Sequence, residues 1–280
     1  MASLALSCRS IVFCALSCLL SSSLCSFSSG ALTLASRCAL VKAPSLVPAI
    51  RRIVFVRAAN LGVLYKDQGK LNEAKVMLDR TLEGREKALG CSHTLTLGTV
   101  NNLGLVYWNQ GKFSEAEAMH NRALEGREKV LGCDHTSTLD TVNNLGVVYW
   151  NQGKFSEAEA MYNRALEGRE KALGRDYTST LNTVNNLGLL YKNQGKLGEA
   201  ETMFDRALEG YEKALGRSHT LTLDTIHNLG VLYKDQGKFE EAETMFNRAL
   251  DGFQSALGQS HQKTQTVTYD LQLLHSSQDL

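Results

Sequence analysis

One unit of 42 residues recurs five times along this chain of 280. Each copy contains the tripeptide Asn-Leu-Gly, which begins at Asn60, Asn102, Asn144, Asn186 and Asn228. The copy that starts at Asn144 differs from the copy before it at only six positions. A unit this short has to bury its apolar face against neighbouring copies. The repeat therefore restricts the chain to an extended stack in which each unit mainly contacts the next.

Each unit is predicted to hold two helices. In the third unit, apolar residues recur at spacings of three and four over about Thr138–Gln152, which is one face of a helix. Gly153 is suited to end this helix, and a second apolar face follows over about Phe155–Leu173. No proline occurs after Pro48, so nothing in the repeats interrupts a helix. The sequence thus predicts an all-α fold and argues against a β-sandwich.

Two local details allow more than one interpretation. Gly168 recurs once per unit inside the second helix, where a glycine costs about 1 kcal/mol relative to alanine. It indicates either a close approach of the next unit or a local break in the helix. Ser137 or Thr138 is a plausible N-cap of the first helix, and Ser156 and Glu159 have the spacing of a capping box in the second.

The two ends of the array differ from its centre. Thr264–His275 aligns with the start of a sixth unit, but Gln272 replaces the glycine, so this stretch is predicted to be a polar capping helix. At the other end, Ile53–Ala59 departs from the sequence that the other units share. The expected organisation is an N-terminal segment (1–52), five repeats (53–262), and a capping helix with a tail (263–280).

The N-terminal segment has a composition of its own. Residues 1–66 contain seven basic and no acidic residues, whereas the remainder contains 23 basic and 29 acidic ones. After Arg9, residues 11–20 form an apolar run of ten, followed by serines, as in a secretory signal peptide. The run is short for a membrane span. A serine-rich, arginine-bearing, acid-free stretch is also typical of an organelle transit peptide.

A third interpretation is a wrongly assigned start codon or exon in front of the repeats. We expect a cytoplasmic location, and a secreted or mitochondrial one if residues 1–40 are a working targeting peptide. Membrane contact is expected only if this segment is a real anchor. Five of the seven cysteines lie in the first 38 residues without the spacing of a metal site.

No residue pattern indicates catalysis. Histidines recur in the turns between units at His93, His135, His219 and His261, with Tyr177 in the third turn. A metal site needs several ligands that converge, so packing on a turn is the better interpretation of these residues. The repeats carry no phosphate-binding loop and no basic run. We therefore expect no enzymatic activity, no cofactor or metal, no small-molecule substrate and no nucleic-acid partner.

The unit resembles the tetratricopeptide repeat. Leu145, Gly146 and Tyr149 match the family pattern in the first helix, and Ala158, Tyr162 and Ala165 match it in the second. The resemblance covers about residues 58–262. The unit departs from the family pattern at Val142, where a bulky aromatic is usual, and at Glu170, where a proline is usual. The resemblance implies a right-handed superhelix of five helical hairpins plus the capping helix.

The length of 42 residues, together with the Glu-Ala-Glu and Glu-Lys-Ala-Leu-Gly phrases, is similar to the kinesin light chain type of repeat. Related arrays form the C-terminal part of fungal nucleotide-oligomerisation receptor-like proteins. The function implied is a non-catalytic scaffold or adaptor for protein–protein interaction. A sensor array detached from such a receptor, and a cargo adaptor for a microtubule motor, are the alternatives.

A second stripe on the first helix indicates where a partner binds. Its residues recur three or four positions apart on the side away from Leu145, and in the third unit they are Asp140, Asn143, Asn144, Val147, Trp150 and Asn151. In the resembled family the first helices line the concave groove, where asparagines can pair with a peptide backbone and tryptophans can anchor it. The alternative is that each asparagine ties two helices together and each tryptophan covers a loop. The candidate partner-binding residues are Asn60, Asn101, Asn102, Asn109, Asn143, Asn144, Asn151, Asn185, Asn186, Asn228, Trp108, Trp150, Lys192 and Lys234.

Overall fold

A computed structural model describes residues 46–278, and side chains from Phe55 to Ser276. This part of the chain consists of eleven α-helices without a strand. The first helices of the hairpins are α3 (Leu46–Asp67), α5 (Thr94–Asn109), α7 (Thr136–Asn151), α9 (Thr178–Asn193) and α11 (Thr220–Asp235). The second helices are α4 (Leu71–Leu89), α6 (Phe113–Leu131), α8 (Phe155–Leu173), α10 (Leu197–Leu215) and α12 (Phe239–Leu257), and α13 (Gln262–Gln278) follows.

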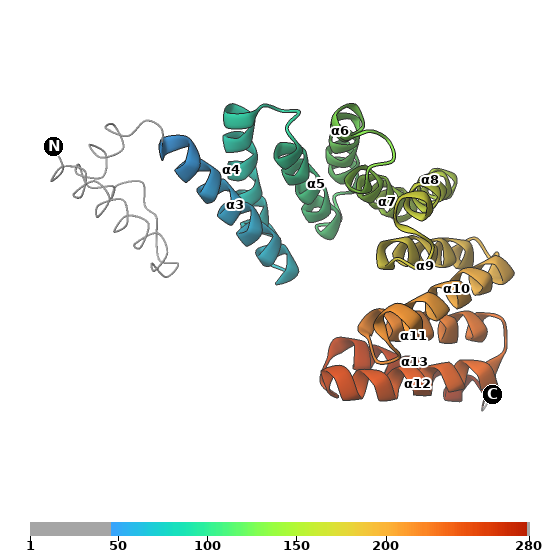
Figure 1. Cartoon of the computed structure of the whole chain (residues 1–280). Helices are drawn as coiled ribbons and strands as arrows, with labels where there is room; N and C mark the ends of the chain where they lie inside the picture. The colour runs from blue at the N-terminus through green and yellow to red at the C-terminus, as the bar shows by residue number, and fades with distance from the viewer. Residues whose placement is uncertain (1–45, 279–280) are drawn as a thin grey trace, which may run out of the picture.

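The hairpins follow one another in a curved stack, with α3 and α4 at one end and α11 to α13 at the other (Figure 1). The first helices α5, α7 and α9 lie on the inner side of the curve, and α6, α8 and α10 lie on the outer side (Figure 1). The prediction of an all-α solenoid of helical hairpins is confirmed.

A continuous core runs through the stack because each first helix packs on the second helix before it. Leu187 and Leu190 of α9 pack on Ala158 and Tyr162 of α8. The same contact joins α5 to α4 and α11 to α10. Burial of apolar area stabilises by about 25 cal/mol per Å². The stability of the stack therefore depends on contacts between repeats as well as on contacts within each hairpin.

Gly168 is explained by a close approach, because α8 is unbroken from Phe155 to Leu173. A Cβ atom at this position would lie 2.5 Å from the Leu139 side chain. Leu139 belongs to α7, the first helix of the same hairpin, so the expectation that the next unit approaches here was wrong about the neighbour. Gly146 faces the ring of Tyr162 in the same way, at 2.6 Å.

The predicted N-cap at Ser137 or Thr138 was wrong. The N-cap of α7 is His135, two residues before Ser137. The Nδ1 atom of His135 accepts a hydrogen bond from the Ser137 N–H at 3.1 Å. Thr138 instead donates to the Gly132 carbonyl at 2.9 Å. The same cap recurs at His93, His219 and His261. The turn histidines therefore satisfy helix N-termini, while Tyr177 makes no such bond.

The predicted capping box was also wrong, because Lys154 holds the N-cap position of α8 without a side-chain cap. Glu159 instead accepts hydrogen bonds from the next repeat, at 3.3 Å from Gln194 and 3.4 Å from Tyr191. Successive second helices are also joined by ion pairs. These are Arg122–Glu86, Arg164–Glu128, Arg206–Glu170 and Arg248–Glu212.

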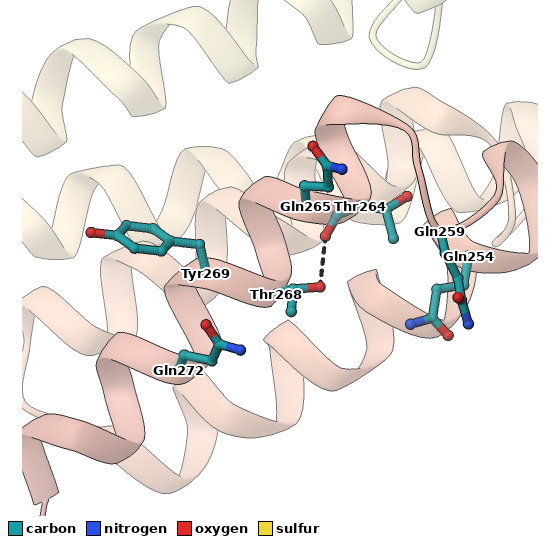
Figure 2. Close-up of a pocket in the computed structure, with 7 residues that line it drawn as sticks. All are labelled: Gln254, Gln259, Thr264, Gln265, Thr268, Tyr269 and Gln272. Carbon is teal, nitrogen blue, oxygen red and sulfur yellow. Dashed lines mark hydrogen bonds between the residues drawn. The ribbon is translucent and has the colours of Figure 1, made fainter.

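The helix α13 covers one end of the stack. Its Val267 and Leu274 are buried in a cluster with Phe246 and Phe253 of α12. Its other side lines an open depression with Gln265, Thr268, Tyr269 and Gln272, where Thr268 donates to the Thr264 carbonyl at 2.9 Å (Figure 2). In complete repeats, the residues equivalent to Gln265 and Gln272 contact the second helix.

At the other end, α3 begins at Leu46, before the boundary drawn at residue 53. The targeting-segment predictions for residues 1–45 lie outside the described residues. Among the helices that are described, none combines the length and the apolarity needed to cross a lipid bilayer.

Candidate partner-binding face

The predicted stripe belongs to the first helices, of which α5, α7 and α9 lie on the inner side of the curve (Figure 1). In α7, Asp140 is exposed and Asn144, Val147 and Trp150 are half-buried, whereas Leu145 is buried. An apolar residue occupies the centre of the stripe in each successive repeat. These half-buried residues are Val63, Leu105, Val147, Leu189 and Val231. The stripe thus combines an apolar line with amide groups beside it.

The asparagines bond to one another between repeats. The Nδ2 atom of Asn144 donates to Oδ1 of Asn101 at 3.4 Å, and the same bond joins Asn186 to Asn143 and Asn228 to Asn185. Each bond of this kind contributes about 0.5–1.5 kcal/mol net. The amide oxygen of Asn144 makes no hydrogen bond within the described range. Asn144, Asn186 and Asn228 therefore tie neighbouring first helices together, and each keeps a second amide N–H beyond that contact.

This row of asparagine bonds between repeats, called the asparagine ladder below, changes at both ends. Ala59 stands where later repeats carry the accepting asparagine, so Asn102 has no amide oxygen to bond, and Asn60 is exposed. At the opposite end His227 replaces that asparagine, and its Nε2 atom lies 2.7 Å from Oδ2 of Asp270 in α13. A histidine–carboxylate contact thus joins the last complete repeat to the capping helix.

The other candidate residues differ in their contacts. Asn109 and Asn151 donate to carbonyls of their own helices, at 2.8 and 2.7 Å. Trp150 packs against the cluster of α8 and α9, and the Nε1 atom of Trp108 is enclosed without a hydrogen-bond partner among the described residues. Lys192 lies 3.5 Å from Asp235 in the next repeat. Lys234 is half-buried at the same repeat position.

Buried arginines were missed at the sequence level. Arg169 of α8 is 4% exposed, and its Nη1 atom donates to the Ser179 carbonyl at 2.8 Å and to Thr183 at 2.5 Å. Its Nη2 atom donates to Asp140 on the stripe at 2.5 Å. The residue lies eleven positions after Ala158 on the apolar face of the helix, so helical spacing could have placed it in the core.

A buried histidine was missed as well. His120 of α6 is fully enclosed, with Nδ1 at 3.1 Å from Oδ1 of Asn101. Burial and the charge of Arg127 lower the pKa of His120 to about 4. The ring is therefore neutral near pH 7, and the Asn101 oxygen requires Nδ1 to be the protonated nitrogen. No group of three or more metal-ligating side chains is found in residues 55–276.

The family follows from the sequence comparison. A family model described as "Tetratricopeptide repeat" matches residues 55–129, 96–171 and 178–255. These segments cover well over half of the chain, which therefore belongs to the tetratricopeptide repeat family. Repeats of this family are typically non-catalytic scaffolds that bind proteins or peptides. No curated protein matches this chain.

Solved structures agree with this fold. The chain is similar to the kinesin light chain nearly identical TPR-like repeats of Podosopora anserina (22% identity, 75% of this chain and 97% of that chain, TM-score 0.61). It is similar to BtubC (BKLC) from P. vanneervenii, with 24% identity, 80% of this chain and 87% of that chain covered, and a TM-score of 0.63. It is also similar to NprR in complex with its cognate peptide NprX, with 20% identity, 86% of this chain and 66% of that chain covered, and a TM-score of 0.60. In fold, the repeats are of the kinesin light chain type.

Proposed function

We propose that this protein is a non-catalytic interaction scaffold whose concave face holds an extended peptide segment or a helix of a partner protein. The observation that carries the proposal is the stripe on successive first helices, where half-buried apolar residues such as Val147 lie beside a row of amides. Amides donate and accept, so they can pair with a peptide backbone. Apolar side chains beside them can take up the partner's side chains.

Two further features support this assignment. Trp108 and Trp150 are half-buried at the ends of two adjacent first helices. Tryptophan is enriched among the residues that dominate binding energy. NprR, which shares the fold, has been solved with a bound peptide. The asparagine bonds between repeats do not conflict with the proposal, because each uses only one of the two N–H groups of its donor amide.

We also propose which parts of the chain bind the partner and where the protein acts. Residues 53–262 with the cap at 263–280 form the binding unit, although its first helix, α3, begins at Leu46 within the preceding segment (1–52). The protein acts in the cytoplasm. A tagged full-length chain tests the location. An uncleaved cytoplasmic product is expected, and cleavage near residues 26–30 with secretion, or import into mitochondria, would overturn it.

Selection of random 12-residue peptides on the immobilised full chain tests the binding face. Selected peptides are then measured by calorimetry against Val147→Asp and against a matched control, Ala160→Asp, at an exposed position of α8. We expect Val147→Asp to weaken binding by more than 10-fold and Ala160→Asp to change it less than 2-fold. Circular dichroism checks that both variants are folded. Equal binding by folded Val147→Asp would place recognition elsewhere.

A further inference from the structure

One position of the second helices is buried in all five repeats. It is occupied by Arg85, Arg127, Arg169, Tyr211 and Phe253. The residue 29 positions earlier, on the concave stripe of the first helix, is its partner in two repeats. Arg169 donates to Asp140 at 2.5 Å, and Tyr211 donates to Asn182. In these two repeats, the polar group at this position therefore has a hydrogen-bond acceptor from the stripe.

The second repeat lacks that partner, because Gly98 stands where Asp140 stands in the third. Arg127 is only 9% exposed. Its Nη1 atom donates to the Ser137 carbonyl at 2.7 Å and to Thr141 at 2.5 Å. Its Nη2 atom makes no hydrogen bond in the described part of the chain. Arg85 differs, since its Nη2 atom donates to the Phe55 carbonyl at 3.4 Å.

Packing does not require a glycine at position 98. Outside the backbone of α5 itself, the only described atom within 4 Å of a Cβ built there is Nη2 of Arg127, at 3.8 Å, which is an ordinary contact distance. The glycines inside the second helices are different, because a Cβ at Gly126 or Gly168 would come within 2.5 Å of a leucine side chain. Gly98 therefore leaves a space beside a buried cation that a larger residue could occupy.

Arg127 forms no ion pair within the described part of the chain. Burial lowers its pKa, and Asp140 opposes that shift. Asp140, however, gives its Oδ1 atom to Arg169. A guanidinium taken out of water needs a charged partner or a full set of acceptors. The third repeat shows that this partner is a carboxylate bound at Nη2.

We propose that Arg127, at the space left by Gly98, binds a carboxylate of the partner segment on the concave face. This inference rests on the proposed function, because Gly98 lies on the same stripe as Asn102 and Leu105. The carboxylate comes from an Asp or Glu side chain or from the C-terminus of the partner. It takes the position that Asp140 takes beside Arg169 in the next repeat.

Acetate is the direct probe of this site. The full chain, labelled with ¹⁵N-arginine, is titrated with acetate at constant ionic strength while the guanidinium resonance of Arg127 is followed by NMR. We expect a saturable shift that is absent with chloride. Gly98→Asp supplies the carboxylate within the chain and should abolish the shift, whereas Gly98→Ala should retain it. Shifts that are equal in Gly98→Asp and the native chain, or equal with chloride, would overturn the proposal.

The selected peptides separate this inference from the proposed function. We expect them to share an acidic residue, and its replacement by the amide, or amidation of the C-terminus where that is the source, should weaken binding about 10-fold or more. Gly98→Asp should reduce the affinity of the acidic peptides alone. If peptides need Val147 but are indifferent to Gly98→Asp, the carboxylate site is wrong and the binding face stands. If Val147→Asp leaves peptide binding intact, the proposed function itself fails.

Discussion

The two ends of the stack are built differently. Leu64 of α3 is 50% exposed, whereas Leu190 and Leu232, at the same repeat position, are 0% exposed because the preceding second helix covers them. The described residues include no helix that covers α3 in this way. At the opposite end, α13 carries Gln265 and Gln272 where α7 carries Leu139 and Gly146. One end keeps the apolar sequence of an internal repeat, and the other has exchanged it for polar residues.

This difference shows that the repeat sequence determines which face of a helix is apolar, but not whether that face is buried. The same leucine contributes to the core or lies in water according to whether a neighbour is present. Within the described residues, the C-terminal end carries polar residues where no further helix packs, whereas the N-terminal end carries the apolar residues of an internal repeat. Substitutions at equivalent positions can measure how large this effect is.

The largest effect is expected for leucine-to-alanine substitutions at the repeat position that Leu64 and Leu190 share. Leu190→Ala should lower the free energy of unfolding by about 2–5 kcal/mol because it opens a cavity in a buried cluster. Leu64→Ala removes the same atoms from a half-exposed side chain and should cost less than about 1 kcal/mol. Chemical denaturation of both variants provides the measurement. Equal losses would mean that a covering element buries Leu64 in solution.

Acid should destabilise the second repeat through His120. The pKa of a histidine in the unfolded chain is about 6.5, and that of the folded His120 is about 4. Stability is therefore unaffected above pH 6.5 and is lost as the pH falls toward 4, by about 3 kcal/mol in total. Denaturation curves between pH 7 and pH 4 measure this loss.

His120→Phe is the matched control, because Phe204 and Phe246 fill the same position in later repeats. Asn101 keeps the hydrogen bond from Asn144 in this variant. Its stability should depend less on pH over the same range. An unchanged pH dependence would show that other groups are responsible for the acid sensitivity.

The asparagine ladder should show a smaller contrast of the same kind. Asn144→Ala removes the bond to Asn101 and should cost about 0.5–1.5 kcal/mol. Asn102→Ala should change the free energy of unfolding by less than about 0.5 kcal/mol, because Ala59 offers it no amide oxygen. Thermal melts give both values. If folded Asn102→Ala loses affinity for a selected peptide, that asparagine serves recognition, and unchanged affinity would exclude it from the site.

The smallest effect is expected at the polar end. Gln265→Leu restores the residue of an internal repeat, but α13 has no second helix to cover it among the described residues. The change in the free energy of unfolding should stay within about 0.5 kcal/mol. The reverse substitution inside the stack, Leu139→Gln, should be clearly destabilising because that leucine is 1% exposed. A stabilising Gln265→Leu would indicate that this face is buried by another molecule or segment.

Much of the fold could be predicted because it depends on short-range patterns. Helical spacing located the hairpins, and Gly153 ends the first helix of its repeat with a positive φ of 75°. The candidate stripe was also visible, since residues three and four apart share a face. Details that depend on competition between partners were harder to predict. Glu159 had the spacing of a capping box, yet it bonds to the next repeat.

The sequence by itself determined the repeat, the two helices in each unit, the polar cap and the stripe on the first helices, because these follow from periodicity along one chain. Only the tertiary structure decided which neighbour Gly168 approaches, that the histidines cap helices, and that the asparagines bond across repeats. It also decided that Arg127 is buried opposite Gly98 without the carboxylate that Arg169 has. Apart from the histidine caps, which bond a backbone N–H only two residues further on, these are distances between residues far apart in sequence. Packing selects among several partners that local patterns leave equally possible.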